Sequence, residues 1–222
     1  MNILATVCKS GGDFGPADVI RLAKRIRRHL NGFDIRTRMI CLTDLPREEF
    51  HKAGVPVPTI FQLRHGWPGW WSKIELFRPG LFSSEDRVLH LDLDTVPVGD
   101  FSELWQPIDS NHLFMLKDFY RPLFAASGVM GWRGGGWEDI FTRFHARSEK
   151  VMGSNQNIQP CGDGAFISSD PLVKASTGYW QDRFPGRVVS YKAHCQRGVP
   201  SAASLVCFHG RPRPTEVDEP WL

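Results

Sequence analysis

Residues 88–96 read Val-Leu-His-Leu-Asp-Leu-Asp-Thr-Val, an apolar run that ends in two carboxylates, Asp92 and Asp94. The run predicts a buried strand over 87–91. Side chains two residues apart point the same way in an extended chain, so we expect both aspartates to face one point while Leu93 turns to the core. Ligands of open α/β sheets gather at the carboxyl ends of strands, so this pair marks the candidate site.

Strand-like and helix-like segments surround this strand. Apolar runs predict further strands over 3–8, 38–43, 59–63, 112–116, 128–132, 187–191 and 205–208. Apolar residues at helical spacing predict helices over 16–30, 70–77 and 137–147. Strands and helices alternate in the first half, which favours an α/β fold with a mostly parallel central sheet flanked by helices.

Composition indicates one globular domain. The chain has 222 residues, of which 41% are hydrophobic and 23% charged, and this excludes intrinsic disorder. The net charge of +3 is too small to indicate a nucleic-acid partner. The basic face of the predicted helix 16–30 also lacks the interleaved aromatic residues that nucleic-acid binding uses, so we expect no nucleic acid.

The cysteines and the N-terminal residues indicate the compartment. Five widely spaced cysteines, an odd number, do not form a disulfide framework of the secreted type. The first residues lack the features of a signal peptide, and no stretch approaches the ~20 apolar residues that span a bilayer. We therefore expect a cytoplasmic protein without a transmembrane segment, and a peripheral membrane contact stays open.

The carboxylate pair suits a divalent cation. Two adjacent like charges repel each other unless a positive charge lies between them, and oxygen ligands suit Mg²⁺ or Mn²⁺. Such a cation can hold the diphosphate of a nucleotide-sugar. The same segment also resembles the first motif of haloacid-dehalogenase-like phosphatases, with Asp92 as nucleophile. Two features disfavour the phosphatase: some ninety residues precede the strand, and the acid after Asp163 comes only at Asp170.

Several further segments, taken in order, resemble those of GT-A glycosyltransferases of the broad glycogenin-like kind. The segments are 5–7 with Phe14, 71–77 (Trp-Ser-Lys-Ile-Glu-Leu-Phe), 92–94, 98–104, 126–130, 161–166 and 206–214. The resemblance implies a single Rossmann-like GT-A domain over 1–222, with a nucleotide-binding half, 1–104, and a sugar- and acceptor-binding half, 105–222. It also implies a hexosyltransferase that uses a nucleotide-sugar, most simply a UDP-sugar. The acceptor, whether glycan, protein or small molecule, is not indicated.

The resemblance also implies roles for single residues. Asp92, Asp94 and His209 would hold Mn²⁺, or Mg²⁺, and Asp163 would be the catalytic residue beside the sugar and acceptor. The implied donor-binding residues are Thr6, Val7, Phe14, Lys73, Leu93, Ser127, Gly210, Arg211 and Arg213. Either Arg211 or Arg213 would contact the diphosphate, because a guanidinium fork suits phosphate oxygens.

Three positions depart from the family pattern. Phe14 stands where Tyr is usual, Ala126 where Asn is frequent, and Gly164 where Gln is frequent. Each change removes a polar group that the family places at the nucleotide or the sugar. A domain that binds a nucleotide-sugar without turning it over therefore stays open as a third hypothesis.

Overall fold

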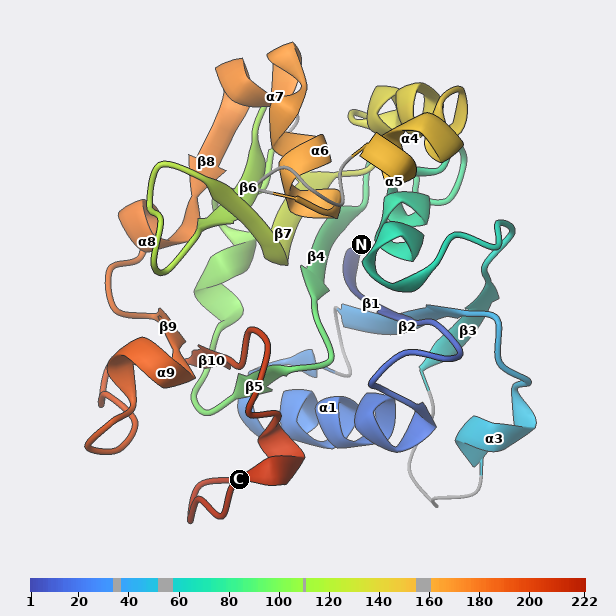
Figure 1. Cartoon of the computed structure of the whole chain (residues 1–222). Helices are drawn as coiled ribbons and strands as arrows, with labels where there is room; N and C mark the ends of the chain where they lie inside the picture. The colour runs from blue at the N-terminus through green and yellow to red at the C-terminus, as the bar shows by residue number, and fades with distance from the viewer. Residues whose placement is uncertain (34–36, 52–57, 110, 155–160) are drawn as a thin grey trace.

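The computed structural model describes residues 1–33, 37–51, 58–109, 111–154 and 161–222. A seven-stranded sheet in the order β3-β2-β1-β4-β7-β6-β8 forms its centre (Figure 1). Its strands are β1 (Asn2–Cys8), β2 (Thr37–Thr43), β3 (Thr59–Gln62), β4 (Arg87–Leu91), β6 (Leu113–Lys117), β7 (Ala125–Arg133) and β8 (Thr177–Tyr179). Strand β7 runs antiparallel to β4 and β6, and the other neighbouring pairs are parallel. The predicted α/β class with a mostly parallel sheet is confirmed.

Helices cover both faces of this sheet. On one face, α1 (Pro16–His29) packs Val19, Leu22 and Ile26 into a core that also holds Leu4 and Leu89. The other face carries η1 (Gly69–Phe77), α4 (Glu138–His145) and α6 (Asp163–Ser169). Figure 1 shows α1 on one side of β1 and β2, and η1 with α4 and α5 on the other. Neighbouring residues of the central strands therefore enter opposite cores, as the alternation of side chains in a strand requires.

The other helices of the described residues are short and lie around these two layers. They are α3 (Glu48–His51), η2 (Ser102–Trp105), α5 (Ser148–Ser154), α7 (Pro171–Ser176), α8 (Trp180–Arg183), α9 (Tyr191–His194) and η3 (Pro214–Glu216). Within the part of the chain that the structure describes, no helix is both long enough and apolar enough to cross a bilayer.

A second sheet of three strands brings the segment that follows Asp94 next to the segment that leads to His209. It has the order β5 (Thr95–Pro97), β10 (Leu205–Cys207) and β9 (Val188–Ser190). Strand β5 begins directly after Asp94, and it pairs with β10, which leads to His209. The backbone N–H of Phe208 donates to the carbonyl oxygen of Asp94 at 3.0 Å. Pairing between β5 and β10 thus joins segments that lie more than a hundred residues apart.

Some observed elements differ from the predicted ones. Segment 70–77 is helical as predicted, but it is a 3₁₀ helix and not an α-helix. The strands β5 and β8 and most of the short helices are not predicted, whereas the equally short strands β9 and β10 are, because they lie in the apolar runs 187–191 and 205–208.

Candidate active site

The two aspartates are held by a turn, which corrects the expectation of an extended chain. Strand β4 ends at Leu91, and the N–H of Thr95 donates to the carbonyl oxygen of Asp92 at 2.9 Å. This turn closes between β4 and β5. It leaves Leu93 buried, as predicted, and lets Asp92 and Asp94 line the same two cavities.

Two cavities meet at this turn. The Phe14 cavity has a volume of about 360 Å³ and is also lined by Val7, Asp13 and Leu93. The His209 cavity is larger, about 740 Å³, and is also lined by residues that include Ser127, Asp163 and Gly210. The residues common to both cavities are Trp70, Lys73, Asp92, Asp94 and Arg213. The candidate site is therefore a junction, with one compartment on each side of the carboxylate pair.

Lys73 forms the floor of the junction. It projects from η1, and its ammonium donates to Asp92 Oδ2 and Ser127 Oγ, both at 3.0 Å, and pairs with Asp163 Oδ2 at 3.1 Å. The Ser127 hydroxyl in turn donates to Asp163 Oδ2 at 2.6 Å. Burial by itself would lower the pKa of Lys73, but the Asp163 and Asp92 carboxylates raise it, so the side chain is a cation. Predicted site residues from four distant segments thus form one hydrogen-bonded cluster.

His90 supports Asp92 from within the sheet. Its Nδ1 lies 3.1 Å from the carbonyl oxygen of Ala5 and its Nε2 lies 3.0 Å from Asp92 Oδ1. Burial tends to raise the pKa of Asp92, but Lys73 and His90 together hold it at about 2. His90 is not among the residues predicted for the site. Its position in an otherwise apolar strand, two residues before an aspartate, could have indicated that it contacts Asp92.

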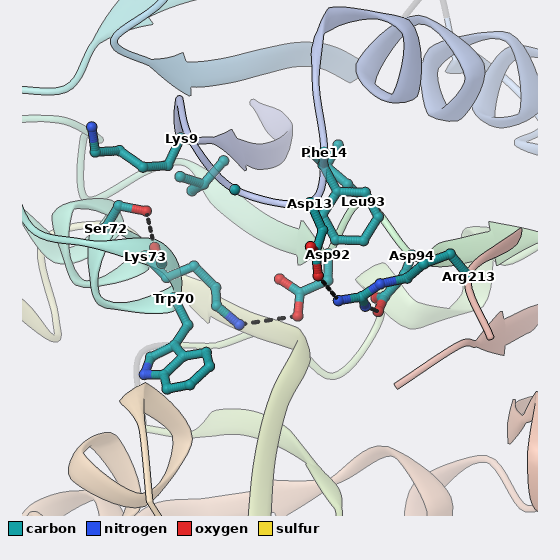
Figure 2. A pocket seen from close by; sticks show the side chains of 13 residues that line it. Lys9, Asp13, Phe14, Trp70, Ser72, Lys73, Asp92, Leu93, Asp94 and Arg213 are labelled. Carbon is teal, nitrogen blue, oxygen red and sulfur yellow. Dashed lines mark hydrogen bonds and ion pairs between the residues drawn. The ribbon is translucent and has the colours of Figure 1, made fainter. Parts of the chain in front are cut away.

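Arg213 reaches the junction from the opposite side (Figure 2). Its Nη1 donates to Asp94 Oδ2 at 2.9 Å, its Nη2 donates to Asp13, and its guanidinium lies 4.6 Å above the centre of the Phe14 ring. Burial raises the pKa of Asp94 and the charge of Asp92 adds to this, giving a value of about 7 in spite of Arg213. Arg211 pairs with Glu216 and does not line either cavity. Of the two candidate arginines, Arg213 is the one at the site.

His209 lies on another wall of its cavity. Its Nε2 is 2.6 Å from the Ser190 hydroxyl oxygen, and its ring stacks on Phe119 with centroids 5.3 Å apart. Burial lowers the pKa of His209, and the positive charge of Lys192 lowers it further. Among the described residues, no three His, Cys, Asp or Glu side chains are gathered as a metal cluster. The predicted ligands therefore share a cavity without meeting at one point, and their common metal stays a prediction.

The charges of the junction nevertheless fit a divalent cation. Four carboxylates, those of Asp13, Asp92, Asp94 and Asp163, pair with the cations Lys73 and Arg213. When all four are ionised, these carboxylates outnumber the two cations. Carboxylate oxygens together with an imidazole are a donor set that suits Mn²⁺, and the oxygens alone suit Mg²⁺.

The remaining predicted donor-binding residues divide between the cavities, with one exception. Val7, Phe14 and Leu93 line the Phe14 cavity, and Gly210 lines the His209 cavity. Thr6 is buried in β1 and lines neither cavity, because its neighbour Val7 takes the side of the strand that faces the site. Trp70 lines both cavities and Asp13 lines the Phe14 cavity, and neither residue is predicted from the sequence to belong to the site.

Comparisons with known proteins identify the fold. No family model matches the chain, and no curated protein matches it. A crystal structure of the galactosyltransferase LgtC with donor and acceptor sugar analogues matches with a TM-score of 0.67 at 16% identity, over 96% of this chain and 89% of LgtC. The glycosyltransferase GlyE of Streptococcus pneumoniae matches with a TM-score of 0.68 at 15% identity, over 96% of this chain and 56% of GlyE. The chain therefore has the GT-A glycosyltransferase fold, as the sequence resemblance implies.

Proposed function

We propose that this protein is a metal-dependent glycosyltransferase, which moves a hexose from a nucleotide-sugar, most simply a UDP-sugar, to the hydroxyl group of an acceptor. The observation that carries the proposal is the junction. Two cavities meet at a cluster of buried carboxylates, one lysine and one arginine. A transferase needs this arrangement, because a donor and an acceptor must each have a compartment that opens onto the same reacting atom.

The donor compartment is the Phe14 cavity. One of its aromatic side chains is Phe14, beside which a nucleobase would lie, and the Arg213 guanidinium covers one face of that ring and reaches Asp94. A guanidinium suits the oxygens of a diphosphate, because its donors form a planar fork. Lys73 supplies a second positive charge on the far side of the pair. The nucleotide would therefore run from Phe14 to the junction, with its diphosphate between Arg213 and Lys73.

Asp92 and Asp94 would hold the cation, Mn²⁺ or Mg²⁺, with His209 as a further ligand. When bound, the metal supplies positive charge to the diphosphate. The chain's own cations act in the same direction. As negative charge develops on the departing diphosphate, Lys73 and Arg213 stabilise it.

In the transfer step, the bond between the anomeric carbon and the diphosphate oxygen breaks, and its electron pair leaves with the nucleoside diphosphate. The acceptor oxygen forms the new bond to that carbon, and the proton of its hydroxyl is released. Asp163, fixed by Ser127 and Lys73, places a carboxylate beside the reacting sugar. An anionic group there stabilises the positive charge that develops on the sugar ring as the bond breaks.

A screen of nucleotide-sugars tests the proposal. The melting temperature is measured with UDP-, GDP- and ADP-sugars, with and without Mn²⁺, because a ligand that binds the native state raises it. Release of the nucleoside diphosphate is then measured for each donor that binds. We expect one donor class to stabilise the protein in the presence of metal and to release its diphosphate.

The same screen separates the two other hypotheses. A binding module would be stabilised by a nucleotide-sugar but would release no diphosphate from any donor, with or without an acceptor. A phosphatase would release inorganic phosphate from an aryl phosphate and lose that activity in Asp92→Asn. Either result would contradict the proposed transfer.

A further inference from the structure

We infer that Trp70 is the platform on which the acceptor binds, and that this acceptor ends in a pyranose ring. The inference rests on the proposed function and names the substrate class of its second compartment. Trp70 is 57% exposed, an unusual exposure for a tryptophan, and it lines both cavities at their junction. Exposed indole surface at the mouth of a polar site is the kind of surface that a ligand covers.

Trp70 and Lys73 lie on the same side of the helix η1. In a 3₁₀ helix, side chains three residues apart lie one above the other. Trp70 precedes Lys73 by three residues in η1, which is 3₁₀ throughout Gly69–Phe77. In Figure 2 the indole lies beside the Lys73 side chain, next to its link with Asp92. A ligand on this indole therefore lies one helical turn from the cluster that would hold the reacting sugar.

Gly162 fixes the orientation of the indole. A Cβ placed on Gly162 would lie 3.1 Å from Trp70 Nε1 and 3.4 Å from both atoms bonded to it, Cδ1 and Cε2. These three distances put Gly162 above the face of the ring, because a contact at the ring edge would leave the two flanking atoms about 4 Å away for ordinary bond lengths. One face of the indole thus packs on the start of α6, and Gly162, with φ of +88°, leaves room for it.

The other face of the indole is available to a ligand. Flat aromatic faces bind ligands that are themselves flat and apolar on one side, and the C–H face of a pyranose is such a surface. Nucleobases are the alternative occupants, but Phe14 offers a ring for the base on the far side of the carboxylate pair. The hydroxyl groups of a pyranose also suit the charged side chains on the wall of the His209 cavity, among them Asp118 and Arg121.

The burial of the surrounding side chains distinguishes the position of the acceptor from that of the donor sugar. Lys73, Ser127 and Asp163 are all buried, so the sugar that they contact lies at the floor of the junction. Trp70 is further out, at the rim. An acceptor that meets a donor sugar at the floor would lie further out, so the rim indole suits the acceptor.

The test compares Trp70→Ala and Trp70→Phe with Leu172→Ala, a control in α7 whose side chain is 62% exposed and lines neither cavity. Saturation-transfer NMR measures binding of methyl β-lactoside, methyl β-glucoside and methyl α-galactoside, with UDP present. Kinetics then measure transfer to any glycoside that binds and donor hydrolysis without acceptor. All variants are first checked for an unchanged melting temperature.

We expect Trp70→Ala to weaken glycoside binding and to raise the acceptor KM about tenfold or more, the factor that one aromatic contact accounts for. Trp70→Phe keeps part of the binding, and Leu172→Ala binds the glycosides and hydrolyses the donor as the wild type does. Unaltered glycoside binding in Trp70→Ala, an equal rise in the donor KM, or no binding of any glycoside by the wild type would overturn the inference. Failure of the proposed function is a separate result, namely the absence of donor hydrolysis.

Discussion

Arg213 connects three parts of the chain through one side chain. Its guanidinium contacts Asp94 in the turn after β4, Asp13 in the loop after β1, and the Phe14 ring. Two of these contacts use different nitrogens of the same planar group. Such a fork cannot be reproduced by the single ammonium of a lysine, so the identity of this residue matters as much as its charge.

We predict that Arg213→Lys and Arg213→Ala both lower kcat/KM for the nucleotide-sugar, by about 10- to 100-fold, the range expected when a charge-assisted pair of hydrogen bonds to a phosphate is lost. Arg211→Ala is the matched control, because Arg211 lies two residues away and outside both cavities. Steady-state kinetics with the donor as the variable substrate measure the effect. Equal losses in Arg211→Ala and Arg213→Ala would contradict the assignment.

Asp92 and Asp94 could be predicted from the apolar strand that ends in two carboxylates. Lys73, Ser127 and Asp163 were implied only by the family resemblance, and all five residues line the His209 cavity. His90 and Trp70 could not be assigned in the same way, because their roles come from partners that are distant in sequence. His90 becomes a support for Asp92 through its contact with Ala5, and Trp70 acquires an open face through its packing on Gly162.

At the scale of elements, strand β7 contributes Ser127 to the polar cluster and packs tightly against Trp180. Gly128 of β7 lies beside the site, where an added Cβ would be 3.6 Å from Asp92 Oδ2, an ordinary contact. Gly131 of the same strand faces Trp180, and an added Cβ would be 2.5 Å from that indole. Trp180 is fully buried and donates its Nε1–H to the carbonyl oxygen of Val129 at 3.2 Å. The indole therefore cannot move aside without losing this bond.

We predict that Gly131→Ala lowers the free energy of unfolding by about 1–3 kcal/mol, the usual effect of overpacking a core. Gly128→Ala, the same change in the same strand, should alter stability by much less. Denaturant unfolding followed by circular dichroism measures both. If the two variants were equally stable, the packing of β7 against Trp180 would not be as described.

Elements within a clear apolar run could be predicted, including the short strands β9 and β10, and elements without such a run could not. Strands β1, β2 and β4 and helix α1 lie where the patterns place them, because each is long enough to bury one side of itself. The turn at Asp94 and the strand β5 are fixed by pairing with β10, more than a hundred residues away. Local sequence does not contain that information.

At the scale of the whole molecule, the second sheet holds the C-terminal segment with His209 and Arg213 beside the turn with Asp92 and Asp94. The segment that carries His209 and Arg213 follows β10, and β10 is held to β5 directly after Asp94. The arrangement keeps the predicted metal ligands in one cavity although their side chains have separate partners in this structure, Arg213 for Asp94 and Ser190 for His209.

We predict that removal of divalent metal abolishes transfer, and that added Mn²⁺ restores it. His209→Ala should need a roughly tenfold or higher concentration of Mn²⁺ for half-maximal activity, because loss of one ligand weakens metal binding. Lys192→Ala is the control, since Lys192 lies in the same cavity and is not a metal ligand. Full activity in a metal-free buffer containing a chelator would contradict the metal site.

The most direct measurement of the central claim is mass spectrometry of an acceptor after incubation with a nucleotide-sugar and Mn²⁺. The wild-type protein is expected to add one hexose to at least one glycoside of the panel and to release one nucleoside diphosphate for each. Asp94→Asn, folded as judged by its melting temperature, should add none at the same protein concentration. Sugar transfer by Asp94→Asn at the wild-type rate, or no transfer by the wild type from any nucleotide-sugar, would contradict the account.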